Sequence, residues 1–265
     1  MSRSPRKALR GLVVGALGRP RLRNVLLSAV DRATADQWDP VIVRDDVARR
    51  FLVGEGIEIG ALSVPLHLPP GAHVRYVDRK SNAALAEDFP ELDPTRFVPV
   101  DVVDDGASLR SFADATLDFV VANHVTEHTE DPIAALQSQV RVLRDGGVLF
   151  LVVPDRRFTF DRDRPATTLE HLQRDHEQGP QWSRREHYRE WVSLVERFDP
   201  QDVEARAAKL DAEQASIHFH TWQLEDFLAL LGYCQDELEL AARLEHAQMI
   251  RAEFLVVLRK HARRG

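Results

Sequence analysis

Residues 117–155 read LDFVVANHVTEHTEDPIAALQSQVRVLRDGGVLFLVVPD and decide the fold. The segment opens with a short apolar run that ends on polar residues, and it closes with a similar run at 146–155. Between the two runs, Pro132 suits a first helical position, and apolar residues recur at helical spacing until a glycine pair. The order predicts two buried strands joined by a helix over 131–147.

The same alternation continues on both sides of this segment. It predicts an open α/β sheet, mostly parallel, with helices on both faces. After Asp155 the alternation stops, and residues 156–215 are too long for a loop inside a compact sheet. We therefore expect a helical lid after the fifth strand, with helices at 184–198 and 202–214. The other expected elements are strands at 56–61, 73–78, 96–103, near 237–245 and at 252–260, and a helix at 221–233.

The composition is that of a water-soluble globular protein, with 44% hydrophobic and 29% charged residues and a net charge of −7. The single Cys234 excludes an internal disulfide framework and is compatible with the cytoplasm. The first acid is Asp31, after seven arginines and lysines. We expect a basic N-terminal arm at 1–40 and one domain at 41–265. The arm is compatible with peripheral contact to an anionic membrane, although packing over the domain is favoured.

The first two strands end in residues that predict an adenosine site. EIGALSVP (58–65) holds one glycine, at 60, where a dinucleotide-binding turn needs three, so a phosphate cradle and a dehydrogenase are disfavoured. Asp78 follows at the distance of an acid that accepts both ribose hydroxyls. Asp101, at the third strand, is placed to take an adenine amino group. An adenosine ligand without phosphates fits this set, and the alternative role for Asp101 is a strand-end cap.

The chain resembles the class I S-adenosylmethionine-dependent methyltransferases from about residue 50 onward. GIEIGALSVP is similar to their glycine motif, VRYVDRKS to their ribose-acid strand, and residues 117–155 to their fourth strand, E-H-x-x-D-P turn and following helix. FHTWQLEDFLALLGY and EFLVVLRK are similar to their late segments. The resemblance implies a Rossmann-like, seven-stranded sheet with an antiparallel last strand, and S-adenosylmethionine as cofactor. It is specific in the order and spacing of its motifs and departs in the glycine motif, which puts the methionine-side contacts in doubt.

The resemblance also implies the cofactor-binding residues. Gly60 and Ala61 would contact the cofactor through their backbone, Asp78 would hold the ribose, and Asn123 would face the methionine moiety or the acceptor. The full predicted set is Glu58, Gly60, Ala61, Asp78, Arg79, Asp101, Val102 and Asn123.

Histidines are the natural bases for removing a proton from a hydroxyl acceptor. His218 and His220 leave the lid in ASIHFHTWQ, and His124 ends the fourth strand, so these three are the predicted catalytic residues, with His220 slightly favoured. Both imidazoles of the His-x-His pair are expected to face the acceptor. His128, in the E-H turn, is more typical of a residue that fastens the loop. Trp222 could stack on a ring, although a core position is more common.

The lid suits a sugar-like acceptor, because it is rich in arginine, aspartate, histidine and aromatic residues. We therefore predict O-methylation of a saccharide, glycolipid or other small hydroxylated molecule. C- or N-methylation of a quinone or amine, and a non-catalytic cofactor-binding protein, are the alternatives. The acidic balance argues against nucleic acid as a substrate. No metal is expected, because no ligand spacing is recognisable among the lid residues His171, His176, Asp161 and Asp163.

Overall fold

The computed structural model describes residues 39–262, which form a seven-stranded sheet in the order β3-β2-β1-β4-β5-β7-β6. The first five strands run parallel, and β7 is antiparallel to both of its neighbours. The predicted fold class is confirmed. The strands are β1 (Gly54–Ile59), β2 (Ala72–Asp78), β3 (Val102–Val103), β4 (Leu117–Asn123), β5 (Leu143–Pro154), β6 (Ala242–Ile250) and β7 (Glu253–Lys260).

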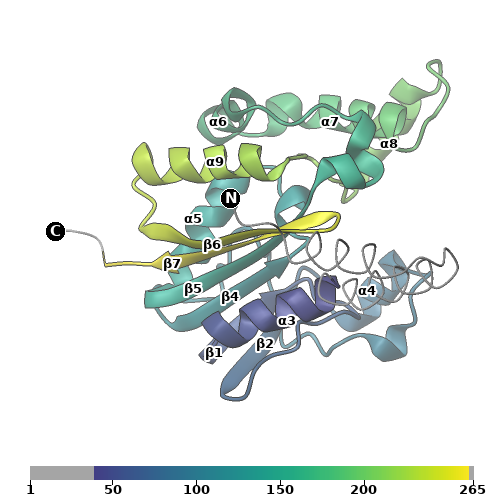
Figure 1. Ribbon diagram of the computed structural model, residues 1–265. Coiled ribbons are helices and arrows are strands. Elements are labelled where there is room, and N and C mark those ends of the chain that lie inside the picture. The colour runs from purple at the N-terminus through teal and green to yellow at the C-terminus, as the bar shows by residue number, and fades with distance from the viewer. Residues whose placement is uncertain (1–38, 263–265) are drawn as a thin grey trace, which may run out of the picture.

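Helices cover both faces of the sheet (Figure 1). α3 lies on one face and α5 and α9 on the other, while α6, α7 and α8 form a further group above α9 (Figure 1). The helices are α3 (Pro40–Phe51), α4 (Asn82–Asp88), α5 (Pro132–Val142), α6 (Leu169–Gln178), α7 (Gln181–Leu194), α8 (Val203–Ala212) and α9 (Leu224–Asp236). Short 3₁₀ turns are η2 (Pro94–Arg96), η3 (Thr126–His128), η4 (Arg156–Phe158) and η5 (Phe160–Asp163).

Two apolar layers hold the sheet, because successive strand residues point to opposite faces. Along β5, Leu149 and Leu151 pack with α5 and α9, whereas Val148 and Phe150 pack with α3. All four side chains are buried. Central strands buried on both faces explain the near-continuous apolar runs in the sequence.

Two element boundaries differ from the sequence prediction for identifiable reasons. The helix predicted to reach residue 147 ends at Val142, because Leu143 is extended and already pairs with Leu117 of β4. The strand predicted at 96–103 shrinks to two residues. The side-chain amide of Asn82 donates to the Val98 carbonyl and accepts from the Val100 N–H. The Val98 carbonyl and the Val100 N–H therefore form hydrogen bonds with this side chain and not with a neighbouring strand.

Element boundaries in the last part of the chain also differ from the sequence prediction. The strand expected near 237–245 begins only at residue 242, because α9 continues to Asp236 and the chain then turns, with Leu240 N–H donating to the Cys234 carbonyl. The insertion at 156–220 is helical, as predicted, but it includes α6, which the sequence prediction missed. The predicted arm at 1–40 lies almost entirely outside the described residues, and Pro40 already begins α3. Within 39–262, no helix is long and apolar enough to cross a membrane.

A buried arginine anchors the insertion. Arg164 is 1% exposed and donates to Asp161 at 2.8 Å, to Glu190 of α7 at 2.7 Å and to the Phe219 carbonyl at 3.2 Å. These bonds join the start, the middle and the end of the insertion.

We expect Arg164→Met to lower the free energy of unfolding by about 3–5 kcal/mol, because it leaves a buried carboxylate without its cation. Urea denaturation at neutral pH measures the loss. The matched control is Arg162→Met, whose exposed side chain lies 4.0 Å from Asp163, and it should change stability by less than about 0.5 kcal/mol. A loss below about 1 kcal/mol for Arg164→Met would show that this arginine does not anchor the insertion.

Candidate functional site

A pocket of about 340 Å³ opens at the carboxyl ends of the parallel strands, where ligands bind in open α/β sheets. Gly60 follows β1, Asp78 ends β2 and Arg79 follows it, and His124 follows β4, so the fold brings these four predicted residues together. The remaining lining residues are Ile59, Leu62, Leu85, Phe89, Asp105, Gly106, Ala107, Val125, His128, Thr129 and Ser216.

Gly60 turns the chain at the mouth of β1. Its φ of +67° lies in the left-handed region that glycine adopts without strain. Leu62 and His124 carry φ values of +47° and +53° at the same rim. Strained backbone of this kind clusters at ligand sites.

The acids predicted to hold adenosine lie in three different environments. Asp78 lines the pocket, and burial raises the pKa of its carboxyl. Glu58 lies behind the pocket and accepts from the Leu66 N–H at 3.0 and 3.1 Å, while burial raises its pKa to about 7. Asp101 is outside the pocket, because its carboxylate accepts from the Tyr76 N–H of β2 at 2.8 Å. The predicted contact of Asp101 with adenine stays a prediction, and Asp105 is the acid after β3 that lines the pocket.

The other predicted cofactor residues lie around the pocket. Ala61 lines a small adjoining recess that shares Asp78 with the pocket. Val102 packs against the core, and the Asn123 amide lies 3.5 Å from a Glu58 oxygen. These three residues do not line the pocket itself.

A buried carboxylate organises the loop after β4. Glu127 is 0% exposed, and its Oε1 lies 3.4 Å from His124 Nδ1. Burial by itself would raise the pKa of Glu127, but the hydrogen bond and the positive charge of His124 outweigh it and hold that pKa below its usual value. A charged carboxylate thus sits beneath the pocket wall.

His124 forms ion pairs with two acids, Glu127 and Glu253. Its Nε2 lies 2.9 Å from Glu253 of β7, which also pairs with Arg44 of α3. Burial lowers the pKa of His124, but the hydrogen bonds and charges of Glu127 and Glu253 raise it to about 9. At neutral pH this imidazole already holds its proton, so it is unsuited to be a general base.

His128 has the opposite character. Burial lowers its pKa, so the ring is neutral at pH 7. Its Nδ1 lies 2.9 Å from the Ile217 carbonyl, which accepts only if Nδ1 carries the proton. Nε2 is then the unprotonated nitrogen, and His128 lines the pocket. The sequence signal that could have identified it is the E-H turn directly after a strand that ends in the site.

The His-x-His pair is placed differently from the expectation, because both rings are buried. His218 is 8% exposed, lies 2.7 Å from Asp161 Oδ2, and stacks edge-on against His128 with 4.7 Å between the ring centroids. His220 is 0% exposed and points to the Glu130 carbonyl at 3.2 Å, away from the pocket lining. Burial lowers the pKa of His220 well below its usual value.

The aromatic residues near the site also differ from the expectation. Trp222 is fully buried in the core and offers no stacking surface. Phe160 of η5 is 54% exposed, and its ring lies 4.8 Å from His218 and 5.6 Å from Trp191. Through His218 this exposed ring connects to His128 and the pocket.

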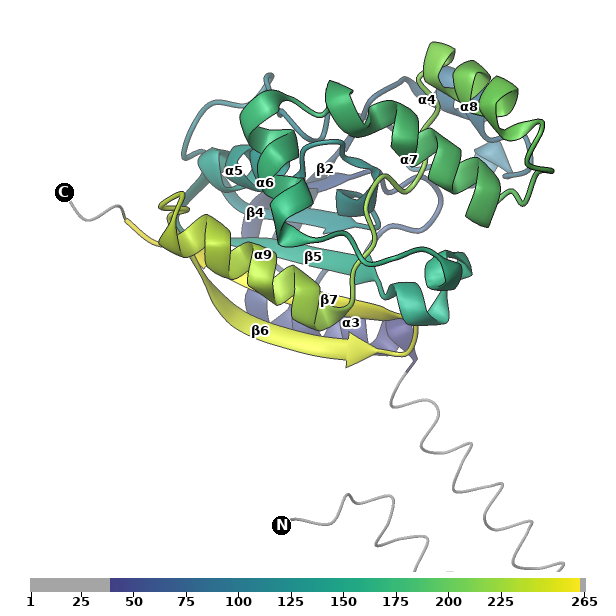
Figure 2. The same ribbon diagram turned by 90° about the horizontal axis from the view of Figure 1, so that it is seen from above.

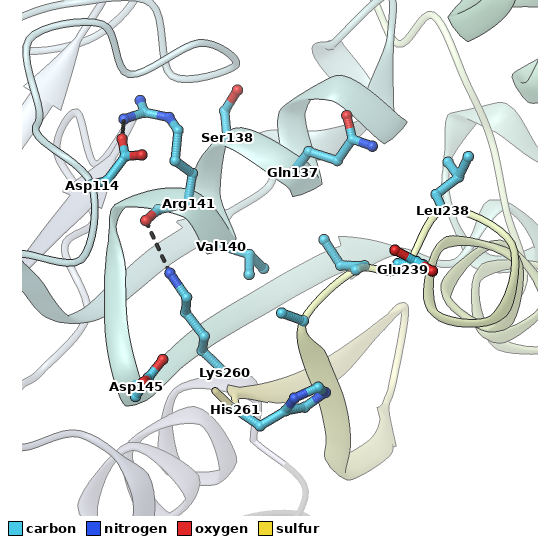
Figure 3. Close-up of a pocket in the computed structure, with 12 residues that line it drawn as sticks. Asp114, Gln137, Ser138, Val140, Arg141, Asp145, Leu238, Glu239, Lys260 and His261 are labelled. Atoms are coloured by element: carbon cyan, nitrogen blue, oxygen red, sulfur yellow. Dashed lines mark hydrogen bonds and ion pairs between the residues drawn. The ribbon is translucent and has the colours of Figure 1, made fainter. Parts of the chain in front are cut away.

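A second hollow of about 620 Å³ (Figure 3) lies at the opposite ends of the strands. Its two long basic side chains already have partners: Arg141 pairs with Asp114, and Lys260 donates to the Arg141 carbonyl (Figure 3). Lys260 also donates to the Leu143 carbonyl. This hollow lies at the amino end of β5, away from the strand ends that carry Gly60 and Asp78. We therefore place the functional site at the smaller pocket.

Residues 76–205 match the family model described as a methyltransferase domain. No curated protein sequence matches the chain significantly. Among solved structures, a protein of Rhodobacter sphaeroides, provisionally described as a Zn-dependent alcohol dehydrogenase, superimposes with a TM-score of 0.50 at 18% identity. The alignment covers 83% of this chain and 90% of that one.

Two further solved structures are described as methyltransferases. One is from Bacillus halodurans, with a TM-score of 0.44, 17% identity and coverage of 79% of this chain and 71% of that one. The other is an S-adenosylmethionine-dependent enzyme from Methanosarcina mazei, with a TM-score of 0.44, 17% identity and coverage of 84% and 98%.

We expect Asp78→Asn to raise the Kd for S-adenosylhomocysteine by about 10- to 100-fold, because hydrogen bonds to a charged group contribute about 1.5–3 kcal/mol. Isothermal titration calorimetry measures the change. Asp101→Asn is the matched control, since its carboxylate lies outside the pocket and faces Tyr76, and its Kd should stay within about 3-fold of the wild type. Equal losses in both variants would contradict the placement of the pocket.

Proposed function

We propose that this chain, which belongs to the class I S-adenosylmethionine-dependent methyltransferases, methylates a hydroxyl group of a saccharide, glycolipid or other small hydroxylated acceptor. The observation that carries the proposal is His128, a neutral imidazole that lines the cofactor pocket with its Nδ1 proton directed to the Ile217 carbonyl. An alcohol must lose its proton during transfer, and a positioned base can take it.

The pocket fits the cofactor. Its volume is in the range of small-ligand sites, and its lining combines apolar side chains with Asp78 at the end of β2 and Asp105 just after β3. Asp78 would accept the ribose hydroxyls, Asp105 would lie on the adenine side, and the turn at Gly60 would let the backbone approach the ligand closely. The cofactor, when bound, supplies an electrophilic methyl group on its sulfonium.

The protein's own residues then have three tasks. The pocket walls hold the acceptor in line and exclude water. His128 takes the hydroxyl proton on Nε2, while the Ile217 carbonyl keeps the ring in the required tautomer. Protonated His124 remains a fixed positive group at the rim, held by Glu127 and Glu253.

The surroundings of the pocket support a ring-shaped, hydroxyl-rich acceptor. The half-exposed Phe160 next to Trp191 offers an apolar face to one side of a sugar ring. Thr129 and Ser216 bring hydroxyls to the lining. In contrast, many insertion arginines already pair with acids: Arg164 with Asp161, Arg184 with Glu130, Arg185 and Arg189 with Glu204, and Arg206 with Glu196. The acceptor is therefore proposed to be recognised by rings and hydroxyls more than by charge.

The proposal includes the domain organisation. Residues 41–265 form the methyltransferase domain, and 156–220 act as its acceptor-side lid. A role of the basic arm in membrane contact concerns residues outside the described range.

We expect His128→Gln to lower kcat by about 100- to 10,000-fold for a hydroxyl acceptor, while the Kd for S-adenosylhomocysteine changes little. A screen of sugars and glycolipids with methyl-labelled cofactor identifies the acceptor, and steady-state kinetics measure the loss. His73→Gln is the matched control, since its side chain is exposed and lies at the far end of β2. Because the pKa of His128 lies below its usual 6.5, kcat should be flat at neutral pH and fall only at more acidic pH.

Full turnover in His128→Gln would contradict a histidine base and favour transfer to a nitrogen or carbon acceptor. Absence of cofactor binding by the wild type would contradict the enzyme assignment itself.

A further inference from the structure

We propose that the insertion holds one zinc ion, bound by His171, Asp175, His187 and His220, and that this ion is a structural clip that joins α6 and α7 to the segment leading to α9. The inference is independent of the acceptor, because none of the four residues lines the cofactor pocket.

The four residues converge from three segments. His171 and Asp175 lie four residues apart on α6 and so share one face of that helix, His187 comes from α7, and His220 comes from the segment that leads to α9. One ligand atom from each residue lies within 4.8 Å of all the others. α6 and α7 lie next to each other above α9, which places this group inside the insertion (Figure 2).

The interatomic distances suit a small tetrahedral ion. His171 Nε2 lies 3.0 Å from His187 Nε2 and 3.2 Å from Asp175 Oδ2, and His220 Nε2 lies 3.7 Å from the same oxygen. His220 Nε2 also lies 3.2 Å from the Glu130 carbonyl, and zinc would replace that contact. Zinc with bonds of about 2.0–2.1 Å separates its ligand atoms by about 3.3 Å. Three imidazole nitrogens and one carboxylate oxygen are a ligand set that zinc accepts.

Asp175 provides a second, independent observation. It is 0% exposed, and its Oδ2, which faces the histidines, has no hydrogen-bond partner. Its other oxygen accepts from Ser183 Oγ at 2.6 Å, which fixes the orientation of the carboxylate. A buried carboxylate without a cation is costly, and a divalent ion at this position would compensate the charge.

The four ligands complete a closed coordination shell, which is typical of structural zinc. The second group of metal-ligand residues, Glu127, His128 and His218, offers only three ligands. It also belongs to the pocket already described. Zinc is therefore assigned to the α6–α7 group.

The test uses the purified full chain. The protein is stripped with a chelator, reloaded with Zn²⁺ and dialysed, and metal content is measured by mass spectrometry. We expect one zinc per chain, a rise in Tm of about 5–10 °C at saturating Zn²⁺, and a visible absorption band of tetrahedral Co²⁺ when cobalt replaces zinc.

Variants separate the site from adventitious binding. His187→Gln and Asp175→Asn should each weaken Zn²⁺ binding by at least about 100-fold and abolish the Tm shift. His176→Gln is the matched control on the same helix, because His176 pairs with Asp131 outside the group, and it should bind zinc like the wild type. A wild type that takes up no zinc after stripping and reloading overturns the proposal whether or not the variants fold. Retention of zinc and of the Tm shift in both ligand variants overturns it as well.

Discussion

The buried carboxylate of Glu127 is the constraint on which the site depends. An ionised group removed from water must be compensated by partners in fixed positions. Here protonated His124, directly after β4, supplies the compensating charge, and the rings of His128 and His218 lie close to the same carboxylate. The chain beyond the insertion is tied to the same residue, because the Phe219 N–H donates to the Glu127 carbonyl at 2.8 Å. The side chain of one residue therefore fixes the pocket wall, and its backbone carbonyl holds the end of the insertion.

The sheet could be predicted from sequence because its strands are buried on both faces, and the helix after β4 carries Asp131 as its cap and Pro132 as its first residue. The contacts of the predicted cofactor-binding acids were harder to predict from sequence. A carboxylate at a strand end has several partners within reach, and the sequence does not reveal which one it takes. Asp101 bonds the neighbouring strand and Asp105 lines the pocket, although only four positions separate them.

The directions of the two imidazoles in the His-x-His pair could not be predicted from sequence either. Residues two apart point to one side only in a regular strand, but the segment at 215–220 is irregular, and the N–H groups of Phe219 and His220 both point to the Glu127 carbonyl. The two imidazoles therefore enter different groups, His218 beside Asp161 and His220 beside α6 and α7. The i, i+4 spacing of His171 and Asp175 was visible in the sequence, yet α6 was not predicted as a helix, so the spacing had no structural meaning.

The histidines at the pocket and the histidines between α6 and α7 are linked through the backbone from Ile217 to His220. The Ile217 carbonyl sets the tautomer of His128, and His220, three positions later, is held in the interior of the insertion. Between them, His218 and Phe219 are fixed by Asp161, Arg164 and Glu127. A shift of the insertion would move the Ile217 carbonyl, and the hydrogen bond from His128 Nδ1–H to that carbonyl would be lost. The packing of α6 and α7 therefore affects the position of the Ile217 carbonyl, and through it the tautomer of His128. The acid–base chemistry of the pocket thus depends on the stability of the insertion.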